Sequence, residues 1–173
     1  MKKGTVNKLY GGHTFGTGAV KDNTVNFSGG TATDYVAGAY VDNTANAADI
    51  TGNKVVFTGG TAVAVEGGAG KGAGALKNNT VTFSGAGSTA DTLRGANSEG
   101  QGLVEENSVA ISGGTVAHAY GAVTDGTGEA KKNFVTITDG TVNTEIAGGV
   151  GYKATSNSVT ISGGTVGGDI YGG

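Results

Sequence analysis

The sequence contains no cysteine, no proline and no tryptophan among its 173 residues. The absence of cysteine excludes a disulfide framework and any metal site built on thiolates. The absence of proline excludes collagen, which also needs glycine at every third position, and it leaves strands free to pair on both sides. Charge is scarce as well. Only 14% of residues are charged and the net charge is −3, so the chain offers no basic footprint for nucleic acid.

Long apolar runs are also missing. No stretch reaches the length that a membrane-spanning helix needs. The first three residues, Met-Lys-Lys, resemble the start of a signal peptide, but a polar segment, Gly4–Lys8, follows where an apolar run is required. We therefore expect no membrane-spanning segment in this chain, and we expect any signal or anchor to lie outside it.

Glycine is abundant, with 36 residues, and it accompanies a repeat. The pattern Asn-x-Val-x-Phe/Ile begins at Asn23, Asn53, Asn79, Asn107, Asn133 and Asn157. A Ser/Thr-Gly-Gly-Thr turn signal follows most copies. Self-similarity at such a period is typical of solenoids, and the order of its apolar positions argues against the disorder that a composition rich in Gly, Ser and Thr would suggest.

The apolar residues of the copies fall into columns. Alternation within each copy predicts a strand whose Asn, Val and Phe/Ile side chains point inward. No copy can bury this face alone, but stacked copies can, through parallel ladders in register. The expected inward columns are Val25, Val55, Val81, Val109, Val135 and Val159; Phe27, Phe57, Phe83, Ile111, Ile137 and Ile161; Val20, Ile50, Leu76, Val104, Ala130 and Ala154; Ala32, Ala62, Val116, Val142 and Val166; and Val36, Tyr120, Ile146 and Ile170.

These columns predict an all-β chain, a parallel β-helix of about six rungs of 24–30 residues, forming a single domain over residues 1–173. Glycine would supply the positive φ angles at the corners, and the inward Asn would bond to the Asn residues above and below it. A propeller needs longer blades and antiparallel hairpins, a leucine-rich repeat needs leucine columns, and the left-handed hexapeptide helix needs a six-residue period. None of these fits.

Three irregularities modify the pattern. The turn of the third copy, Ser84–Thr89, is two residues longer than the others and predicts a bulge at the corner. The loop before each Asn varies in length and carries much of the charge, which indicates either a binding face or a solvated edge. Gly4–Gly12 resembles Gly164–Gly173, so we expect a fragment of a longer array whose terminal rungs could associate end to end.

The residues of catalytic chemistry are few. Polysaccharide hydrolases and lyases need clustered carboxylates, and we find no pair of them at matching offsets from the repeating Asn. Arg94 is the single arginine, His13 and His118 each stand alone, and the run Gly67–Gly72 lacks the Lys-Ser/Thr of a phosphate loop. The threonines after the turn (Thr31, Thr61, Thr115, Thr141 and Thr165) form one column, too few for an ice-binding array. We predict no catalytic, cofactor-binding or metal site, no cofactor and no enzymatic activity.

The run Asn157–Val166 and the corner Ile170–Gly173 resemble passenger-domain repeats of Gram-negative autotransporters, the adhesins of type V secretion. The resemblance implies a right-handed β-helix, secretion, and display on the bacterial cell surface. It also implies contact with a protein or glycan of a host or neighbouring cell. We therefore expect a non-enzymatic structural or adhesive stalk. The alternative is a carbohydrate-active or glycan-binding β-helix, which a surface lined by carboxylates and aromatics would favour.

Overall fold

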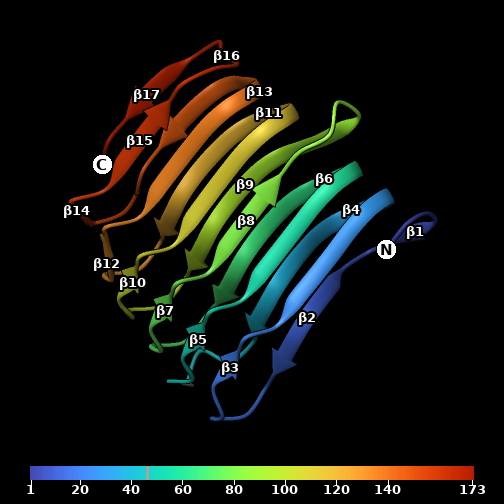
Figure 1. Cartoon of the computed structure of the whole chain (residues 1–173). Helices are drawn as coiled ribbons and strands as arrows, with labels where there is room; N and C mark the ends of the chain where they lie inside the picture. Colours follow the sequence, from blue (N-terminus) through green and yellow to red (C-terminus); the bar gives the residue numbers. More distant parts are fainter. Residues whose placement is uncertain (46) are drawn as a thin grey trace.

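The computed structural model describes residues 1–45 and 47–173. Within this part of the chain all regular structure is β-strand, with no helix, and the strands stack as a parallel β-solenoid of about six turns (Figure 1). The predicted fold class is therefore confirmed.

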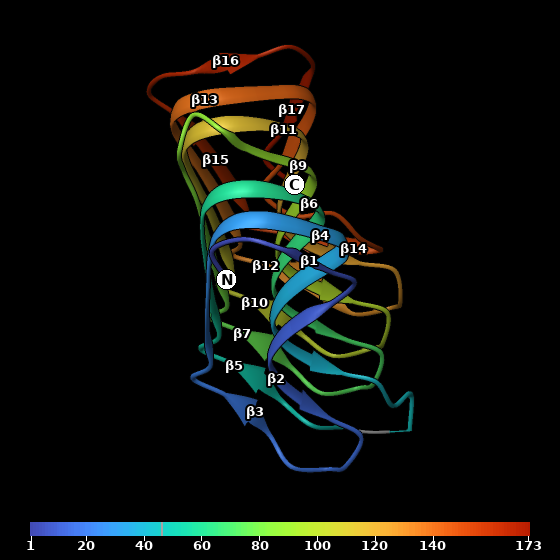
Figure 2. The ribbon, with the colours of Figure 1, turned by 90° about the vertical axis from the view of Figure 1, so that its right-hand side faces the viewer.

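Two sheets run along the solenoid. The small sheet has six short strands: β3 (Val20–Lys21), β5 (Ile50–Thr51), β7 (Leu76–Lys77), β10 (Val104–Glu105), β12 (Glu129–Lys131) and β14 (Lys153–Thr155). The large sheet has eleven: β1 (Thr5–Val6), β2 (Leu9–Thr14), β4 (Thr24–Val41), β6 (Lys54–Gly70), β8 (Thr80–Phe83), β9 (Ser88–Ser98), β11 (Ser108–Thr124), β13 (Phe134–Ala147), β15 (Ser158–Ile161), β16 (Thr165–Val166) and β17 (Asp169–Tyr171). The long strands bend around the rod, so that one strand supplies more than one side of a rung (Figure 2).

The interior is built from the predicted columns. Val25 pairs with Val55 and Phe27 with Phe57 in one parallel register, and the same pairing continues into the next rungs. The buried phenylalanines stack, with ring centroids 4.6 Å apart for Phe27 and Phe57 and 5.1 Å apart for Phe57 and Phe83. Burying each such side chain stabilises the fold by about 1.5–3 kcal/mol. Like residues therefore stack above like through the whole core.

One predicted column is wrong at a single rung. Tyr120 does not point inward with Val36 and Ile146; Ala119 is buried at that position, and Tyr120 lies on the outer surface. The cause is a register shift between β11 and β13. Ala119 comes three residues after the inward Val116, whereas its partner Ile146 comes four residues after Val142. The inward side chain is thus displaced by one position, and the tyrosine turns outward.

The repeating asparagines form a ladder at the corner between the small sheet and the long strands. Asn53, Asn79, Asn107 and Asn133 are fully buried, and the outer two, Asn23 and Asn157, are partly exposed. Each rung donates through its backbone N–H and its side-chain Nδ2 to Oδ1 of the next Asn, as Asn53 does to Asn79 at 3.1 and 3.0 Å. Nδ2 also donates to a small-sheet carbonyl, that of Val20 in the case of Asn53. The predicted ladder is confirmed.

Glycine serves two different purposes at the two corners. The first corner is the turn that follows the Phe/Ile position. There Gly60 has a φ of 96° and Gly140 a φ of 95°, the left-handed conformation expected at this turn. The second corner contains Gly38, Gly67, Gly95 and Gly121. There glycine is needed because the backbones of neighbouring rungs approach one another closely. A Cβ on Gly95 would collide with the carbonyl oxygen of Gly121 and lie 2.6 Å from the nitrogen of Ser108. The expectation that positive φ explains every corner glycine is therefore wrong for the second corner.

The position before the repeating Asn is left-handed in every full rung. Asp22, Asn78, Glu106, Lys132 and Ser156 have φ between 51° and 59°, and Gly52 occupies the same column with a φ of 68°. Residues other than glycine adopt this conformation at a cost, so the sharp entry into each long strand stores backbone strain.

The third copy departs from the others as the sequence predicts. Strands β8 and β9 replace one continuous strand, and the loop between them projects from the sheet (Figure 1). The hydroxyl of the buried Ser88 donates to the Ser84 carbonyl and closes the loop. Pairing then resumes, because Thr89 lies opposite both Thr61 and Thr115.

Candidate binding surface

The outward side chains after the first corner form a second set of columns. Tyr10, Ala37, Glu66, Arg94 and Tyr120 are successive partners in one column on β2, β4, β6, β9 and β11. The next column contains His13, Tyr40, Ala69 and Asn97 in the same order. The register thus brings polar and aromatic residues from different rungs onto one face.

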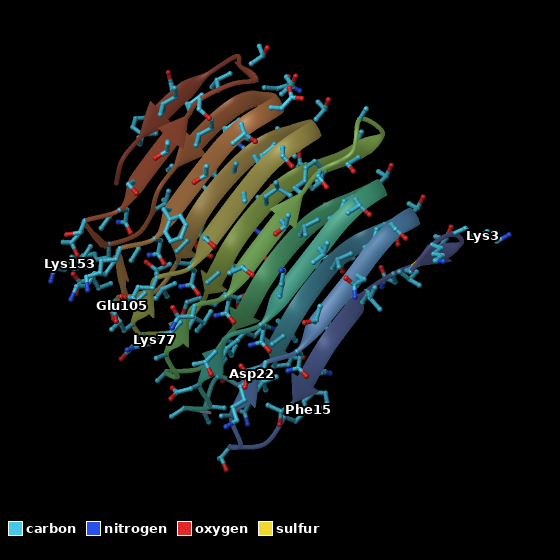
Figure 3. The ribbon with its side chains drawn as sticks, in the orientation of Figure 1. Lys3, Phe15, Asp22, Lys77, Glu105 and Lys153 are labelled. Atoms are coloured by element: carbon cyan, nitrogen blue, oxygen red, sulfur yellow. The ribbon has the colours of Figure 1, made fainter. Side chains whose placement is uncertain are left out.

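Five aromatic side chains meet at the N-terminal end of this face. We call them the aromatic platform: Tyr10, His13, Phe15, Tyr35 and Tyr40. Tyr10 lies at the centre, stacked on His13 at 4.9 Å and on Tyr40 at 5.3 Å, with Tyr35 edge-on at 5.4 Å. His13 also contacts Phe15 at 4.6 Å. Phe15 lies just after the end of β2 (Figure 3), is 66% exposed and contacts the platform through His13.

One edge of the platform is polar through Lys8 and Asp34. The Lys8 ammonium lies 5.0 Å from the Tyr35 ring centroid and 3.4 Å from the Asp34 carboxylate. The Tyr10 and Tyr35 hydroxyls share a hydrogen bond of 2.9 Å. Partial burial, together with that hydrogen bond, raises the pKa of Tyr35 far above its usual value, so the phenol stays protonated.

A second ion pair, Lys71 and Asp42, lies at the edge beside Tyr40. The two groups lie 2.8 Å apart, and the Tyr40 hydroxyl donates to Asp42 at 3.3 Å. The hydrogen bond from Lys71 lowers the pKa of Asp42 and raises that of Lys71, so both remain charged at neutral pH. The Lys71 ammonium lies 6.0 Å from the Tyr40 ring centroid. Each edge therefore pairs one cation with one carboxylate beside a tyrosine ring.

A buried carboxylate occupies the neighbouring rungs. Glu66 is 5% exposed and accepts hydrogen bonds from Arg94 at 2.8 Å and from Asn97 at 3.2 Å. Burial raises the pKa of Glu66, and the Arg94 charge opposes that shift. The only arginine of the sequence thus compensates a buried acid.

Farther along the face, Tyr120 donates to Glu145 at 3.1 Å and lies 3.3 Å from Nδ1 of His118. Burial, followed by the hydrogen bond to Glu145, raises the pKa of Tyr120 to about 12. The register also places Glu145 beside Asp169. The expectation that no two carboxylates share an offset is wrong for this pair, because Glu145 follows Asn133 and Asp169 follows Asn157 by the same 12 residues.

Several of the charged residues before the repeating Asn lie on or beside the small sheet. Glu105 contacts Lys77 at 3.3 Å and both Lys131 and Lys132 at 3.7 Å, and Figure 3 shows Lys77, Glu105 and Lys153 following one edge of the rod. The hydrogen bond from Lys77 lowers the pKa of Glu105. These charges satisfy one another across rungs, which favours the solvated-edge interpretation of this side.

The threonine column and the two histidines, which the sequence also singles out, contact neighbouring side chains on the outer surface. The threonine column gains Thr5 and Thr89 from the register, and Thr89 donates to Thr61 at 2.9 Å. His13 and His118 are not alone, because each stacks on a tyrosine. Over residues 1–45 and 47–173, no group of three His, Cys, Asp or Glu side chains is arranged to hold a metal ion, and no helix is long and apolar enough to cross a membrane.

The aromatic platform was missed from the sequence. Tyr10 and His13 precede the first counted repeat, and outward positions follow no apolar period that would single them out. The available signal in the sequence was that four of its eight tyrosines and histidines lie within the first forty residues. No family model, curated protein or solved structure matches the chain.

Proposed function

We propose that the chain is a non-enzymatic structural segment, a stalk, of a secreted or cell-surface protein of the autotransporter type. The observation that carries the proposal is the continuity of the parallel register, from the pairing of β1 with β4 to that of β13 with β15. Each rung pairs in parallel with its neighbours through the same Asn, Val and Phe/Ile columns, so rod length follows directly from the number of rungs.

The interior supports a structural role more than a catalytic one. The stacked phenylalanines and the Asn ladder fill the interior of the rod with side chains that pack on or bond to their equivalents in neighbouring rungs. At about 4.8 Å per rung, the turns give a rod about 30 Å long. The varied residues lie outside, on loops and outward columns, where they can change without altering the stack.

Location is tested by surface proteolysis. The chain is tagged within its natural reading frame, and protease is added to intact cells of the source organism. We expect the tag to be digested before lysis or to be found in the medium. A tag that stays protected until the cells are broken would contradict the proposal.

The stalk role is tested by changing the number of rungs. Two extra copies of the 26-residue rung 107–132 are inserted after Lys132. Each copy begins with Asn107, which takes the place of Asn133 as the acceptor for the rung before it, so the Asn ladder continues. We expect the rod to lengthen by about 10 Å in small-angle scattering, with surface display unchanged. Loss of folding or of display in this variant would overturn the role.

The enzymatic alternative depends on Glu145 and Asp169, the carboxylates that share a column. Incubation with neutral and acidic polysaccharides should release no new reducing ends or unsaturated products. Turnover that disappears in Glu145→Gln would establish the enzyme instead.

A further inference from the structure

We propose that the aromatic platform binds the ring face of a neutral sugar, as part of a pyranose-containing glycan. This inference goes beyond the stalk function and does not depend on it or on where the chain is located. It rests on the rings of Tyr10, Tyr40 and Phe15, on the two ion pairs that flank them, and on the rigid strands that hold them.

The rings supply the stacking surface. A pyranose ring presents axial C–H groups on one face, and these carry partial positive charge that suits the negative face of an aromatic ring. Tyr10 and Tyr40 stack with an interplanar angle of 18°, so they orient their faces alike, and Phe15 extends the surface while being 66% exposed. Tyrosine and phenylalanine lose little conformational entropy on binding, because each has two side-chain torsions.

The strands keep the platform in place before a ligand arrives. Tyr10 lies on β2, and Tyr35 and Tyr40 lie on β4, and the two strands pair from Leu9 with Val36 to Thr14 with Val41. The hydroxyl bond between Tyr10 and Tyr35 and the bond from Tyr40 to Asp42 fix the ring tilts. A surface that is ordered in advance avoids part of the entropic cost of binding.

The flanking charges select a neutral, hydroxyl-rich ligand. Lys8 with Asp34 and Lys71 with Asp42 form two pairs of opposite sign, so the edges carry no net charge. Sugar hydroxyls can donate to the carboxylates and accept from the ammonium groups, which gives orientation at the margin of an apolar surface. An anionic ligand such as nucleic acid would find no excess of cations here.

A cationic ligand is also disfavoured. Aromatic clusters often bind ammonium groups over their faces. Here the protein's own lysines occupy those places, with Lys8 over the Tyr35 ring and Lys71 over the Tyr40 ring. The ring surface left for a ligand is the part that neither ammonium group covers, centred on Tyr10 where it stacks with Tyr40 and extended by Phe15.

The test is native affinity electrophoresis of the purified chain. The gels contain hydroxyethyl cellulose, mannan or galactan as neutral probes, and heparin or polygalacturonate as charged ones. We expect retardation by at least one neutral polysaccharide. Tyr40→Ala should weaken it at least ten-fold, and Phe15→Ala should weaken it as well. Phe15 is exposed and outside the core, so the second variant retains its value if the first fails to fold.

The matched control is Tyr152→Ala, which removes an 85% exposed tyrosine that lies outside the platform, and it should leave retardation unchanged. Equal loss in the control would contradict the assignment. So would retardation by heparin or polygalacturonate alone, or by none of the neutral probes. If the platform variants reduce binding of the chain to cells while no neutral probe retards it, the platform binds a ligand of another class and the proposal is overturned.

Discussion

Oδ1 of Asn133 accepts two hydrogen bonds from Asn107, one from its backbone N–H at 2.9 Å and one from its side-chain Nδ2 at 3.0 Å. The same arrangement links every neighbouring pair in the ladder, so each side chain is acceptor for one rung and donor to another. The ladder satisfies buried polar groups that an apolar residue at this corner would leave unpaired.

Asn107→Leu should therefore lower the free energy of unfolding by roughly 1–3 kcal/mol. The substitution removes the acceptor of the Asn79 backbone N–H and side chain, and it removes the donor to the Leu76 carbonyl. Urea denaturation followed by circular dichroism measures the change. Asn143→Leu, at an exposed position, should change stability by less than about 0.5 kcal/mol. Equal effects of the two substitutions would show that the ladder contributes nothing specific.

Gly95→Ala should destabilise the chain by about 1–3 kcal/mol, the usual cost of forcing extra volume into a packed site. The added methyl group would collide with the Gly121 carbonyl oxygen and with the backbone of Ser108. Gly87→Ala is the matched control, because a Cβ there meets nothing within 4 Å. Thermal unfolding of the two variants side by side should lower the midpoint only for the first. A normal midpoint for Gly95→Ala would mean that the second corner can open.

Lys132→Gly should stabilise the chain. A residue with a Cβ in the left-handed conformation destabilises the folded state by about 1–2 kcal/mol. Glycine avoids this cost, but it loses more conformational entropy on folding, which offsets about 0.5–1 kcal/mol of the gain. The net gain is about 0.5–1 kcal/mol, since the exposed ion pairs of Lys132 contribute little. The reverse change, Gly52→Ala in the same column, should lose at least as much, because the added Cβ must also displace the Asp22 carboxylate, 2.5 Å away. Denaturant midpoints that move in the opposite directions would refute this account of the column.

Glu66→Gln should alter the pH dependence of stability. Burial raises the pKa of Glu66 in the folded protein above its unfolded value of about 4.3. Unfolding then releases a proton between the two values, so the contribution of Glu66 to stability is full below the unfolded pKa and falls as pH rises through the folded pKa. The wild-type free energy of unfolding, measured against that of the variant, should decline from pH 4 to pH 7. A difference that stays constant over this range would exclude the raised pKa.

The inward half of this molecule could be predicted from its sequence because each inward position repeats. Val, Phe/Ile and Asn recur at fixed offsets, and each must fit the residue above and below it, so the pattern carries the register. The prediction failed at Tyr120, where the spacing from Val116 to the next inward residue is shorter than the spacing from Val142 to Ile146. A shift of one residue changes which side chain is buried, and composition alone does not reveal it.

The outward half was much less predictable. Contacts such as those of Tyr10 with Tyr35 or Arg94 with Glu66 join residues 25 and 28 positions apart. They depend on the register having been established first. Nothing in the local sequence constrains an outward side chain, so the platform and the Glu145–Asp169 pair become visible only when the rungs are stacked.

The loop between β8 and β9 has a consequence for engineering and for variation between related chains. Residues inserted at this corner leave the ladders on both sides aligned, because Thr89 rejoins Thr61 and Thr115 directly after the excursion. The number of residues at this corner therefore does not change the spacing between rungs. Peptides grafted between Ser84 and Ser88 should project outward at a fixed position along the rod. The corner is therefore an attachment site for epitopes, affinity tags or fluorophores that leaves the interior of the scaffold unchanged.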